Sequence, residues 1–600
     1  MNVIEIENIY NKRIQAFKNK ELKVQKRLIV LSFLRFFSFI IAIALFVLLF
    51  KRVSPIILFG GVVSMTLFII FVIQYLKQTD LLNHYKNLIK INREEKEVLN
   101  NNYSFFNDGT DYISRDHPYS YDLDIFGNGS LFQYLNRTFT IVGRDLLANR
   151  LLNLDFNKQE IEKRHEAIKE LSPEIDWRQN VMATGYSTPI SVDDNKKIQY
   201  WIDKPIYFIN KIFYKALVIL LPAATIAFLL LLILGVSHYS WFMILGLIQL
   251  FIASFLMRKT NNEQRVVSEG LRILKSYSKI LKFIEEKNFD SKLLNNLKSE
   301  IKTENESAGH AFKKLIKIID AFDTRLNIFL GVILNATLMW DLLSMIRLEI
   351  WKRKYGSNLN KWIKIIAEFD LYCCVANFKF NNPDFIYPEI ADKIIFRSLD
   401  LGHPLIPYKK RINNDFCLNK SGEMVIVTGA NMAGKSTFLR TVGVNLILAM
   451  NGMPVCASDF KFRLTDIFSG MRTADSLNEN ESYFYAELKR LKHIIEKLKQ
   501  KKQSFILLDE ILKGTNSVDK AKGSWKFVEH LTELKATGVI ATHDLTLCDL
   551  ETKYPQNIIN KCFEVQIDKN KIKFDYKLHS GITQNMNASL LMQQMGIFSN

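Results

Sequence analysis

Residues 428–437 carry the clearest chemistry in this 600-residue chain. They read TGANMAGKST and fit the phosphate-binding pattern G-x-x-x-x-G-K-[ST]. The apolar run 424–427 predicts a buried strand before this loop, and the periodicity of 436–450 predicts a helix after it. Gly429 and Gly434 would let backbone N–H groups face a phosphate chain, and the start of the helix adds a positive dipole end. The segment therefore predicts a nucleotide-binding loop.

The loop also assigns roles to single side chains. Lys435 is expected to reach the β- and γ-phosphates, and the Ser436 hydroxyl is expected to bind Mg²⁺. The predicted cofactors are accordingly ATP and Mg²⁺. The residues expected to hold the nucleotide are Gly429, Ala430, Asn431, Met432, Ala433, Gly434, Lys435, Ser436 and Thr437.

Two further apolar strands are predicted to end in polar groups. The run 505–508 is followed by Asp509 and Glu510, where Asp509 would bind Mg²⁺ and Glu510 would activate the attacking water. The run 538–542 is followed by His543, which could sense the γ-phosphate. Each pattern alone also fits an ordinary polar strand end, but their order after a phosphate loop favours catalysis. Glu510, Lys435 and His543 are therefore the predicted catalytic residues.

These motifs resemble the ATPase of the MutS family. The resemblance rests on Asn431-Met432 inside the loop, on the spacing of Ser482, Phe484 and Glu487, on Gly514-Thr515 after the acidic pair, and on Ala541-Thr542-His543. It implies an ABC/MutS-type α/β P-loop fold and a homodimer, in which Ser482 contacts the partner subunit's nucleotide in trans. DNA is a plausible further partner by the same resemblance.

Weaker similarity extends upstream. Residues 131–147, 161–168, 366–370 and 402–405 resemble the family's helical core and the entry to its ATPase. No Phe-x-Glu wedge lies near the N-terminus, and little room precedes the core for a mismatch-reading domain. We therefore expect a relative of the mismatch repair proteins that does not itself read mismatches. The tail 581–596 resembles the family's closing segment, and the few residues after it leave the dimer contact open.

Four apolar runs predict membrane helices: residues 28–50, 54–76, 216–236 and 240–257. Each approaches or exceeds the length that crosses a bilayer, and short loops join them into two hairpins. Lysines and arginines flank the outer ends, so the positive-inside rule predicts a multi-pass protein of the inner or plasma membrane with its ATPase and core in the cytoplasm. The alternative is a pair of buried hairpins in a large soluble protein.

A fifth apolar run, residues 326–346, contains Asn327, Asn335 and Asp341. A fifth crossing would place the ATPase on the far side of the membrane from ATP. We therefore expect this run to be a buried helix of the core.

Charge and cysteine content restrict the remaining possibilities. The net charge of +19 suits nucleic acid or an anionic membrane surface. Residues 1–27 hold seven basic and three acidic side chains, which favours the membrane explanation for that part. Residues 258–317 mix both signs at helical spacing and do not form a clear DNA-binding stripe. The six cysteines include no C-x-x-C pair, so no zinc site or disulfide framework is predicted.

The sequence thus predicts a multidomain protein with a C-terminal α/β P-loop ATPase, an all-α core and lever region, and two transmembrane hairpins. The predicted function is a membrane-anchored ATPase that couples ATP hydrolysis across a dimer interface to DNA binding. The alternative is a membrane mechanochemical or scaffolding ATPase that acts on lipid or a protein partner without DNA. The predicted segments are 1–27 (basic helix), 28–76 (first hairpin), 77–212 (linker and first part of the core), 213–257 (second hairpin), 258–395 (lever and second part of the core) and 396–600 (ATPase).

Overall fold

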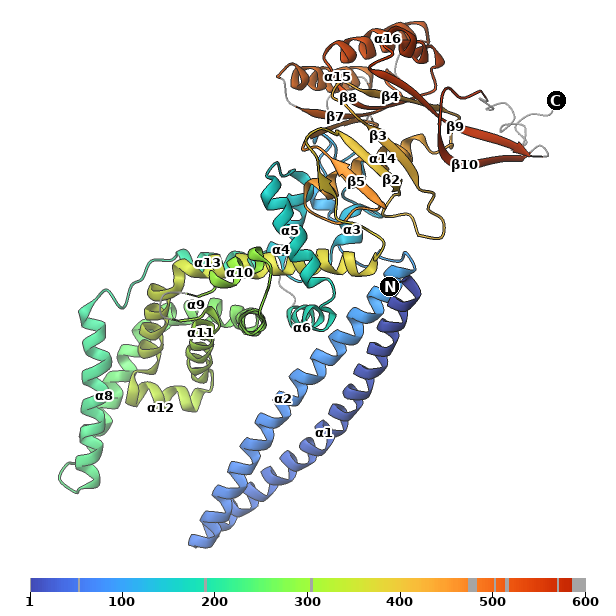
Figure 1. Cartoon of the computed structure of the whole chain (residues 1–600). Coiled ribbons are helices and arrows are strands. Elements are labelled where there is room, and N and C mark those ends of the chain that lie inside the picture. The colour runs from blue at the N-terminus through green and yellow to red at the C-terminus, as the bar shows by residue number, and fades with distance from the viewer. Residues whose placement is uncertain are drawn as a thin grey trace.

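A long helical region is followed along the chain by an α/β region that contains two sheets (Figure 1). The computed structural model describes residues 2–51, 54–187, 192–302, 306–472, 483–500, 503–512, 517–568 and 571–584. Two helical hairpins project from the helical region, and Figure 1 shows both pointing away from the α/β region.

The first hairpin consists of α1 (Val3–Lys51) and α2 (Pro55–Leu99), which lie side by side along their length. The Ser64 hydroxyl donates to the Ser38 carbonyl over 2.7 Å and joins the helices at a buried point. Most apolar side chains of the predicted spans point outwards, as in Phe33 and Phe59. Both helices continue beyond the apolar runs, so α1 passes without a break through the predicted boundary between residues 27 and 28.

The second hairpin consists of α8 (Ile212–Ile233) and the start of α9 (Tyr239–Glu286). The Gln249 side chain donates to the Thr225 hydroxyl over 2.5 Å between the two helices. Beyond residue 257, α9 enters the helical region. Its exposed face is apolar in the hairpin, whereas its continuation buries Tyr277 and Ile280.

Among the described residues, four helices are long and apolar enough to cross a membrane. They are α1, α2, α8 and the first part of α9, which agrees with the predicted runs in length and composition. A fifth candidate consists of two helices, α12 (Ile328–Leu338) and α13 (Trp340–Asn381), bent by 80° at Met339.

The expectation of one buried helix over 326–346 is wrong. The run breaks at Met339, whose φ of 49° is left-handed, and α12 exposes most of its apolar side chains. Asn335 and Asp341 are buried, but they lie on either side of the bend rather than within one continuous helix. Asn335 accepts a hydrogen bond from the Asp341 amide over 3.0 Å, and Asp341 forms an ion pair with Arg325 over 2.8 Å.

The helical core gathers around α13, which packs along several shorter helices. Asp370 of α13 is fully buried and accepts hydrogen bonds from the amides of Phe139 and Thr140 at the start of α4. The remaining helical elements are η1 (Thr110–Tyr112), α3 (Leu131–Leu135), α4 (Ile141–Leu152), α5 (Lys158–Leu171), α6 (Ile175–Tyr186), α7 (Val192–Asp203), α10 (Lys292–Ser299), α11 (Ala308–Asp323) and η2 (Thr324–Leu326).

The α/β region contains a six-stranded sheet in the order β10-β9-β4-β8-β7-β6. Only the β9–β10 pair is antiparallel, so the carboxyl ends of β4, β8 and β7 share one edge. The strands are β4 (Met424–Gly429), β6 (Asp466–Gly470), β7 (Ser504–Asp509), β8 (Thr537–Thr542), β9 (Ile558–Asp568) and β10 (Lys571–Ser580).

Alternate residues of these strands face two cores. Val425 and Leu507 pack on the side of α14 (Lys435–Met450). Ile426 and Leu508 pack with apolar side chains of α15 (Tyr483–Lys499) and α16 (Ser517–Glu533). This alternation explains why the strands are nearly continuous apolar runs in the sequence. Two short helical turns follow β8, η3 (Leu545–Asp549) and α17 (Leu550–Lys553).

A smaller four-stranded sheet in the order β1-β5-β2-β3 adds its phenylalanines to the α14 side. Its strands are β1 (Glu389–Ile390), β2 (Phe396–Leu401), β3 (Asn414–Leu418) and β5 (Asp459–Phe462).

Candidate functional site

The predicted phosphate loop joins β4 to α14 at the shared strand edge. Gly429 ends the strand at φ 152°, and a Cβ atom there would lie 2.8 Å from the Phe563 carbonyl oxygen. Gly434 has a left-handed φ of 107° just before the helix begins. Met432 is also left-handed, at 67°, and its side chain is 72% exposed. The two glycines therefore stand where close approach and backbone conformation require them.

Lys435 opens α14 and is buried against its own loop. Its ammonium group donates to the carbonyl oxygens of Gly429 over 2.8 Å and Ala430 over 3.0 Å. The same nitrogen lies 3.1 Å from Nε2 of His543. The lysine charge is thus held inside the curl of the loop, where a phosphate chain would need it.

The three predicted catalytic side chains meet although they follow three different strands. His543, just after β8, lies with Nε2 3.0 Å from Oε1 of Glu510, which follows β7. This nitrogen can donate to the Glu510 carboxylate or accept from Lys435, but one tautomer cannot do both. The imidazole is therefore placed to change partners between the Glu510 carboxylate and the Lys435 ammonium group.

Asp509, the last residue of β7, is buried, and its Oδ1 has no hydrogen-bond partner among the described residues. A buried carboxylate oxygen without a donor suits a cation. Ser436, the second predicted Mg²⁺ ligand, lines the adjoining cavity. Among the described residues, no group of three or more His, Cys, Asp or Glu side chains is arranged to hold a metal ion.

A cavity of about 430 Å³ covers the loop, within the usual range for small-molecule sites. Part of its lining consists of predicted nucleotide contacts, among them Asn431 and Thr437. The part of the lining that comes from distant segments of the chain, called the upper wall from here on, was not predicted. The GHPL segment at 402–405 could have indicated one side of it, whereas nothing in the sequence pointed to β10. The upper wall contains Leu401, His403, Ile406, Lys410, Ile412, Asn414, Phe563 and Tyr576, and Phe438 and Thr441 of α14 are further lining residues.

His403 is the titratable group of this upper wall whose pKa departs most from its ordinary value. Burial, with the charges of Arg440 and Arg411, lowers the pKa of its imidazole to about 4. Its Nδ1 accepts a hydrogen bond from the Leu405 amide over 3.3 Å. The ring is therefore neutral near pH 7 and presents an uncharged wall to whatever occupies the cavity.

Helix α15 is linked to the residues that follow the acidic pair. Oε1 of Glu487 accepts a hydrogen bond from the Leu512 amide over 2.6 Å. Glu510 and Leu512 both have left-handed backbones, with φ of 51° and 59°. Ser482, predicted to act in trans, and Gly514-Thr515 lie outside the described residues.

The α/β region is joined to the start of the helical core by Asp122, whose side chain is fully buried. Its carboxylate accepts hydrogen bonds from the Ser469 hydroxyl over 2.7 Å and from the amides of Met471 and Arg472 over 3.2 and 3.0 Å. Arg490 of α15 forms an ion pair with it over 2.7 Å. One carboxylate therefore holds the end of β6 and the helix that carries Glu487.

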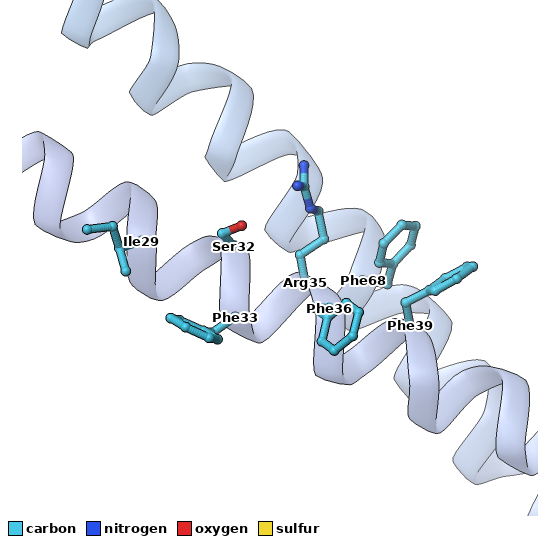
Figure 2. Close-up of a pocket in the computed structure, with 7 residues that line it drawn as sticks. All are labelled: Ile29, Ser32, Phe33, Arg35, Phe36, Phe39 and Phe68. Atoms are coloured by element: carbon cyan, nitrogen blue, oxygen red, sulfur yellow. The ribbon is translucent and has the colours of Figure 1, made fainter.

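A second hollow lies on the first hairpin, far along the chain from these motifs (Figure 2). Aromatic side chains form most of its wall, and Arg35 is the charged residue among those that line it. Figure 2 shows Arg35 directed towards the neighbouring helix, and its guanidinium lies 4.5 Å from the centre of the Tyr75 ring. The residues lining this hollow include no general base that could activate the Ser32 hydroxyl, so the nucleotide cavity is the better candidate for catalysis.

Comparison with known proteins identifies two family domains. MutS domain V matches residues 425–595, which include the phosphate loop, Asp509, Glu510 and His543. MutS domain III matches residues 119–376, a range that includes the second hairpin.

Curated relatives match over part of the chain. Human "MutS protein homolog 4" is 35% identical over 217 residues, which are 34% of this chain and 23% of the human protein. "DNA mismatch repair protein MutS" of Fervidobacterium nodosum is 30% identical over 234 residues, 38% of this chain and 28% of that protein. The chain thus spans about a quarter of the length of the curated relatives it matches. Two family domains in the expected order, together with these relatives, show that the chain belongs to the MutS family.

Proposed function

We propose that this chain is a membrane-anchored ATPase that couples ATP binding and hydrolysis, across a dimer interface, to DNA binding. The observation that supports it most is the meeting of Lys435, His543 and Glu510 over the phosphate loop. Nε2 of His543 lies 3.1 Å from the lysine nitrogen and 3.0 Å from the Glu510 carboxylate. Hydrolysis of a phosphoanhydride requires a general base, a ring that can carry a proton and a cation that binds phosphate, all within hydrogen-bond reach of one another.

The described residues divide this chemistry among them. Glu510 would orient the attacking water and accept its proton. His543 would hold the Glu510 carboxylate in place by donating from Nε2, and Lys435 would then turn from its loop carbonyls to the phosphates. Ser436 and Asp509 would hold Mg²⁺, which when bound neutralises phosphate charge and orients the phosphate chain. Because the imidazole of His403 is neutral, the part of the cavity that it lines would suit the uncharged nucleobase of ATP.

The DNA and dimer parts of the proposal rest on the family. Several relatives carry the printed name "DNA mismatch repair protein", and the net charge of +19 suits a polyanion. A homodimer would let Ser482 of one subunit complete the site of the other. Glu487 follows Ser482 by five residues in the sequence and accepts a hydrogen bond from the amide of Leu512, two residues after Glu510. Closure of that interface would therefore shift the segment that carries the Glu510 carboxylate.

The membrane part of the proposal rests on four helices of suitable length, whose apolar side chains are largely exposed. Leaving those side chains in water would be costly, whereas a bilayer would cover them. Basic residues flank the outer ends of both hairpins. By the positive-inside rule they support a multi-pass inner- or plasma-membrane protein whose core and ATPase would lie in the cytoplasm.

A second function is favoured by one observation. Many lysines of the lever region contact carboxylates: Lys275 pairs with Asp320 over 2.9 Å, and Lys314 pairs with Glu306 over 2.7 Å. Paired lysines make a weaker polyanion surface than unpaired ones. This favours the alternative, in which the ATPase moves its helical region against lipid or a protein partner without DNA.

The ATPase assignment is tested by substituting Lys435→Ala in the full-length protein in lipid nanodiscs. We expect steady-state hydrolysis to fall at least about a hundredfold, as when a preorganised charge contact to a transition state is removed. The control is Lys420→Ala, an exposed lysine of the same region, which should hydrolyse ATP like the parent. Undiminished hydrolysis by Lys435→Ala would contradict the assignment of the site.

The partner is tested on the same preparation by adding homoduplex, mismatched or branched DNA at two salt concentrations. A change in hydrolysis that weakens as salt rises supports the DNA function. A basal rate that does not respond to any DNA but responds to anionic lipid in the nanodisc supports the alternative.

A further inference from the structure

The segment between α11 and α13 turns back on itself instead of continuing in one direction. The 3₁₀ turn η2 ends α11, and α12 follows it and meets α13 at 80°. The two ends of the segment are tied together. The Trp340 indole donates to the Ala321 carbonyl over 2.8 Å, and Arg325 forms an ion pair with Asp341 over 2.8 Å. A chain whose entry and exit touch cannot cross a bilayer between them.

The depth of α12 follows from its contact with α9. A Cβ atom built on Gly246 would lie 3.5 Å from the Ala336 carbonyl oxygen, so the two helices touch at this point. Gly246 is twelve residues before Arg258, which flanks the apolar part of α9. At 1.5 Å per residue, the contact lies about 18 Å along α9 from that basic flank. If α9 crosses a bilayer, α12 is near its middle.

The side chains of α12 suit that depth. Residues 328–338 contain no charged residue. The exposed fractions are 77% for Ile328, 82% for Phe329 and 58% for Ile333. Figure 1 shows α12 lying crosswise to α8, between the two ends of that helix. Such a row of exposed apolar groups next to a bilayer-length hairpin continues the apolar surface of that hairpin.

Several polar groups of the turn are paired within it, which lowers the cost of placing them in hydrocarbon. Nη1 of Arg325 and Oδ1 of Asp341 have no hydrogen-bond partner among the described residues. Oδ1 of Asn327 accepts from the Leu330 amide over 3.2 Å at the start of α12. Asn335 donates to the Gly331 carbonyl and accepts from the Asp341 amide, each over 3.0 Å. The Arg325–Asp341 pair, at most 9% exposed, places its two charges together.

We propose that residues 324–341 form a re-entrant membrane element, with α12 in the hydrocarbon core and lipid acyl chains as the partner of its exposed face. This inference rests on the proposed membrane anchoring. The element enters and leaves on the side of the ATPase, so the number of crossings stays at four. A second copy of the chain could reach this face only inside the same bilayer, and α12 offers it no charge for recognition.

The test uses the full-length protein in nanodiscs, with Cys417→Ser as background because that thiol is the half-exposed one, the other five being buried. A fluorophore is attached to Phe329→Cys, and quenching is measured with lipids brominated near the chain ends or near the headgroups. Phe251→Cys, on the exposed face of α9, reports the membrane anchoring itself. Val518→Cys, exposed on α16, is the control outside the bilayer. Ile333→Cys serves as a second site should the first variant fold poorly.

We expect the label at 329 to be quenched by chain-end bromines to within about twofold of the label at 251, and the label at 518 not to be quenched. Quenching at 251 without quenching at 329 and 333 would overturn the re-entrant element and leave the anchoring intact. Absence of quenching at all three would overturn the anchoring and, with it, this inference. Oxidative cross-linking of the 329 thiols of two chains, together with loss of quenching, would show that a second copy covers the face and would overturn the assignment to lipid.

Discussion

Removing the Asp122 carboxylate should release the edge of the larger sheet from the helical core. Asp122 accepts two backbone amide bonds, at Met471 and Arg472, and pairs with Arg490. In Asp122→Ala these donors lose their acceptor in a fully buried position. In Asp122→Asn one carbonyl oxygen remains, and it can accept a hydrogen bond from some of these donors. The two variants therefore separate loss of charge from loss of every acceptor.

The magnitude follows from the surroundings. Breaking a buried ion pair by removing one partner costs about 3–5 kcal/mol. Arg490 keeps a hydrogen bond from Nε to the Ser469 carbonyl over 2.7 Å and its side chain is 22% exposed, so its share of that cost is reduced. Each unsatisfied amide adds about 1–3 kcal/mol. We expect about 4 kcal/mol of local destabilisation for Asp122→Ala and about half of that for Asp122→Asn.

Hydrogen exchange of the Met471 and Arg472 amides is the direct assay. A local cost of about 4 kcal/mol corresponds to roughly a thousandfold faster exchange where opening limits protection. Amides in the middle of β8, remote from Asp122, serve as the internal reference. Exchange at 471 and 472 that stays within about threefold of the parent in the alanine variant would refute the argument that this carboxylate holds the sheet edge.

Three further outcomes follow from contacts already described or from one buried ion pair. Burial lowers the pKa of His403 to about 4, so the stability it contributes is present above pH 6.5 and is lost as the pH falls from 6.5 towards 4. We expect about 1.4 kcal/mol of stability to be lost between pH 7.5 and about pH 5.5 in the parent and not in His403→Gln, measured by thermal unfolding. Glu95 pairs with Arg137 over 2.7 Å with both side chains almost fully buried. Glu95→Ala should therefore cost about 3–5 kcal/mol, and the double variant with Arg137→Met less, in a thermal double-mutant cycle. Glu487→Ala should lower kcat with little change in KM because the Leu512 amide loses its acceptor, whereas Glu487→Gln should retain most activity; equal losses in both would contradict this.

The catalytic edge could be predicted from sequence because its parts are local. The strand at 424–429 and the helix from 435 lie where the phosphate-loop pattern placed them. Asp509 and His543 each follow an apolar run that predicts a buried strand, and both runs form parallel strands of the larger sheet. Parallel strands bring their carboxyl ends together, so the motifs had to meet. The catalytic roles themselves stay predictions.

The upper wall of the cavity could not be predicted in the same way. Tyr576 and His403 reach the loop through strand pairing and a long connection, and no local pattern encodes such contacts. The prediction for the fifth apolar run, residues 326–346, was wrong for a different reason. Asn335 and Asp341 are buried, but at a bend: the Asp341 backbone amide donates to the Asn335 side chain where α12 meets α13. Residue type alone does not separate a polar group buried in a core from one that caps a turn.

The length of α2 beyond its predicted span has a geometric consequence. Residues 77–99 continue the same helix for about 35 Å at 1.5 Å per residue, and Leu88, Ile89 and Ile91 of this stretch are buried in the helical core. A membrane-anchored hairpin would therefore be rigidly joined to the core. Two chains anchored in this way would diffuse in one plane, with their nucleotide sites at one height and in one orientation. Such confinement raises the effective concentration of one subunit for the other without any new contact. Assembly of the two-subunit site would then depend on how crowded the membrane is rather than on the amount of protein in the cell.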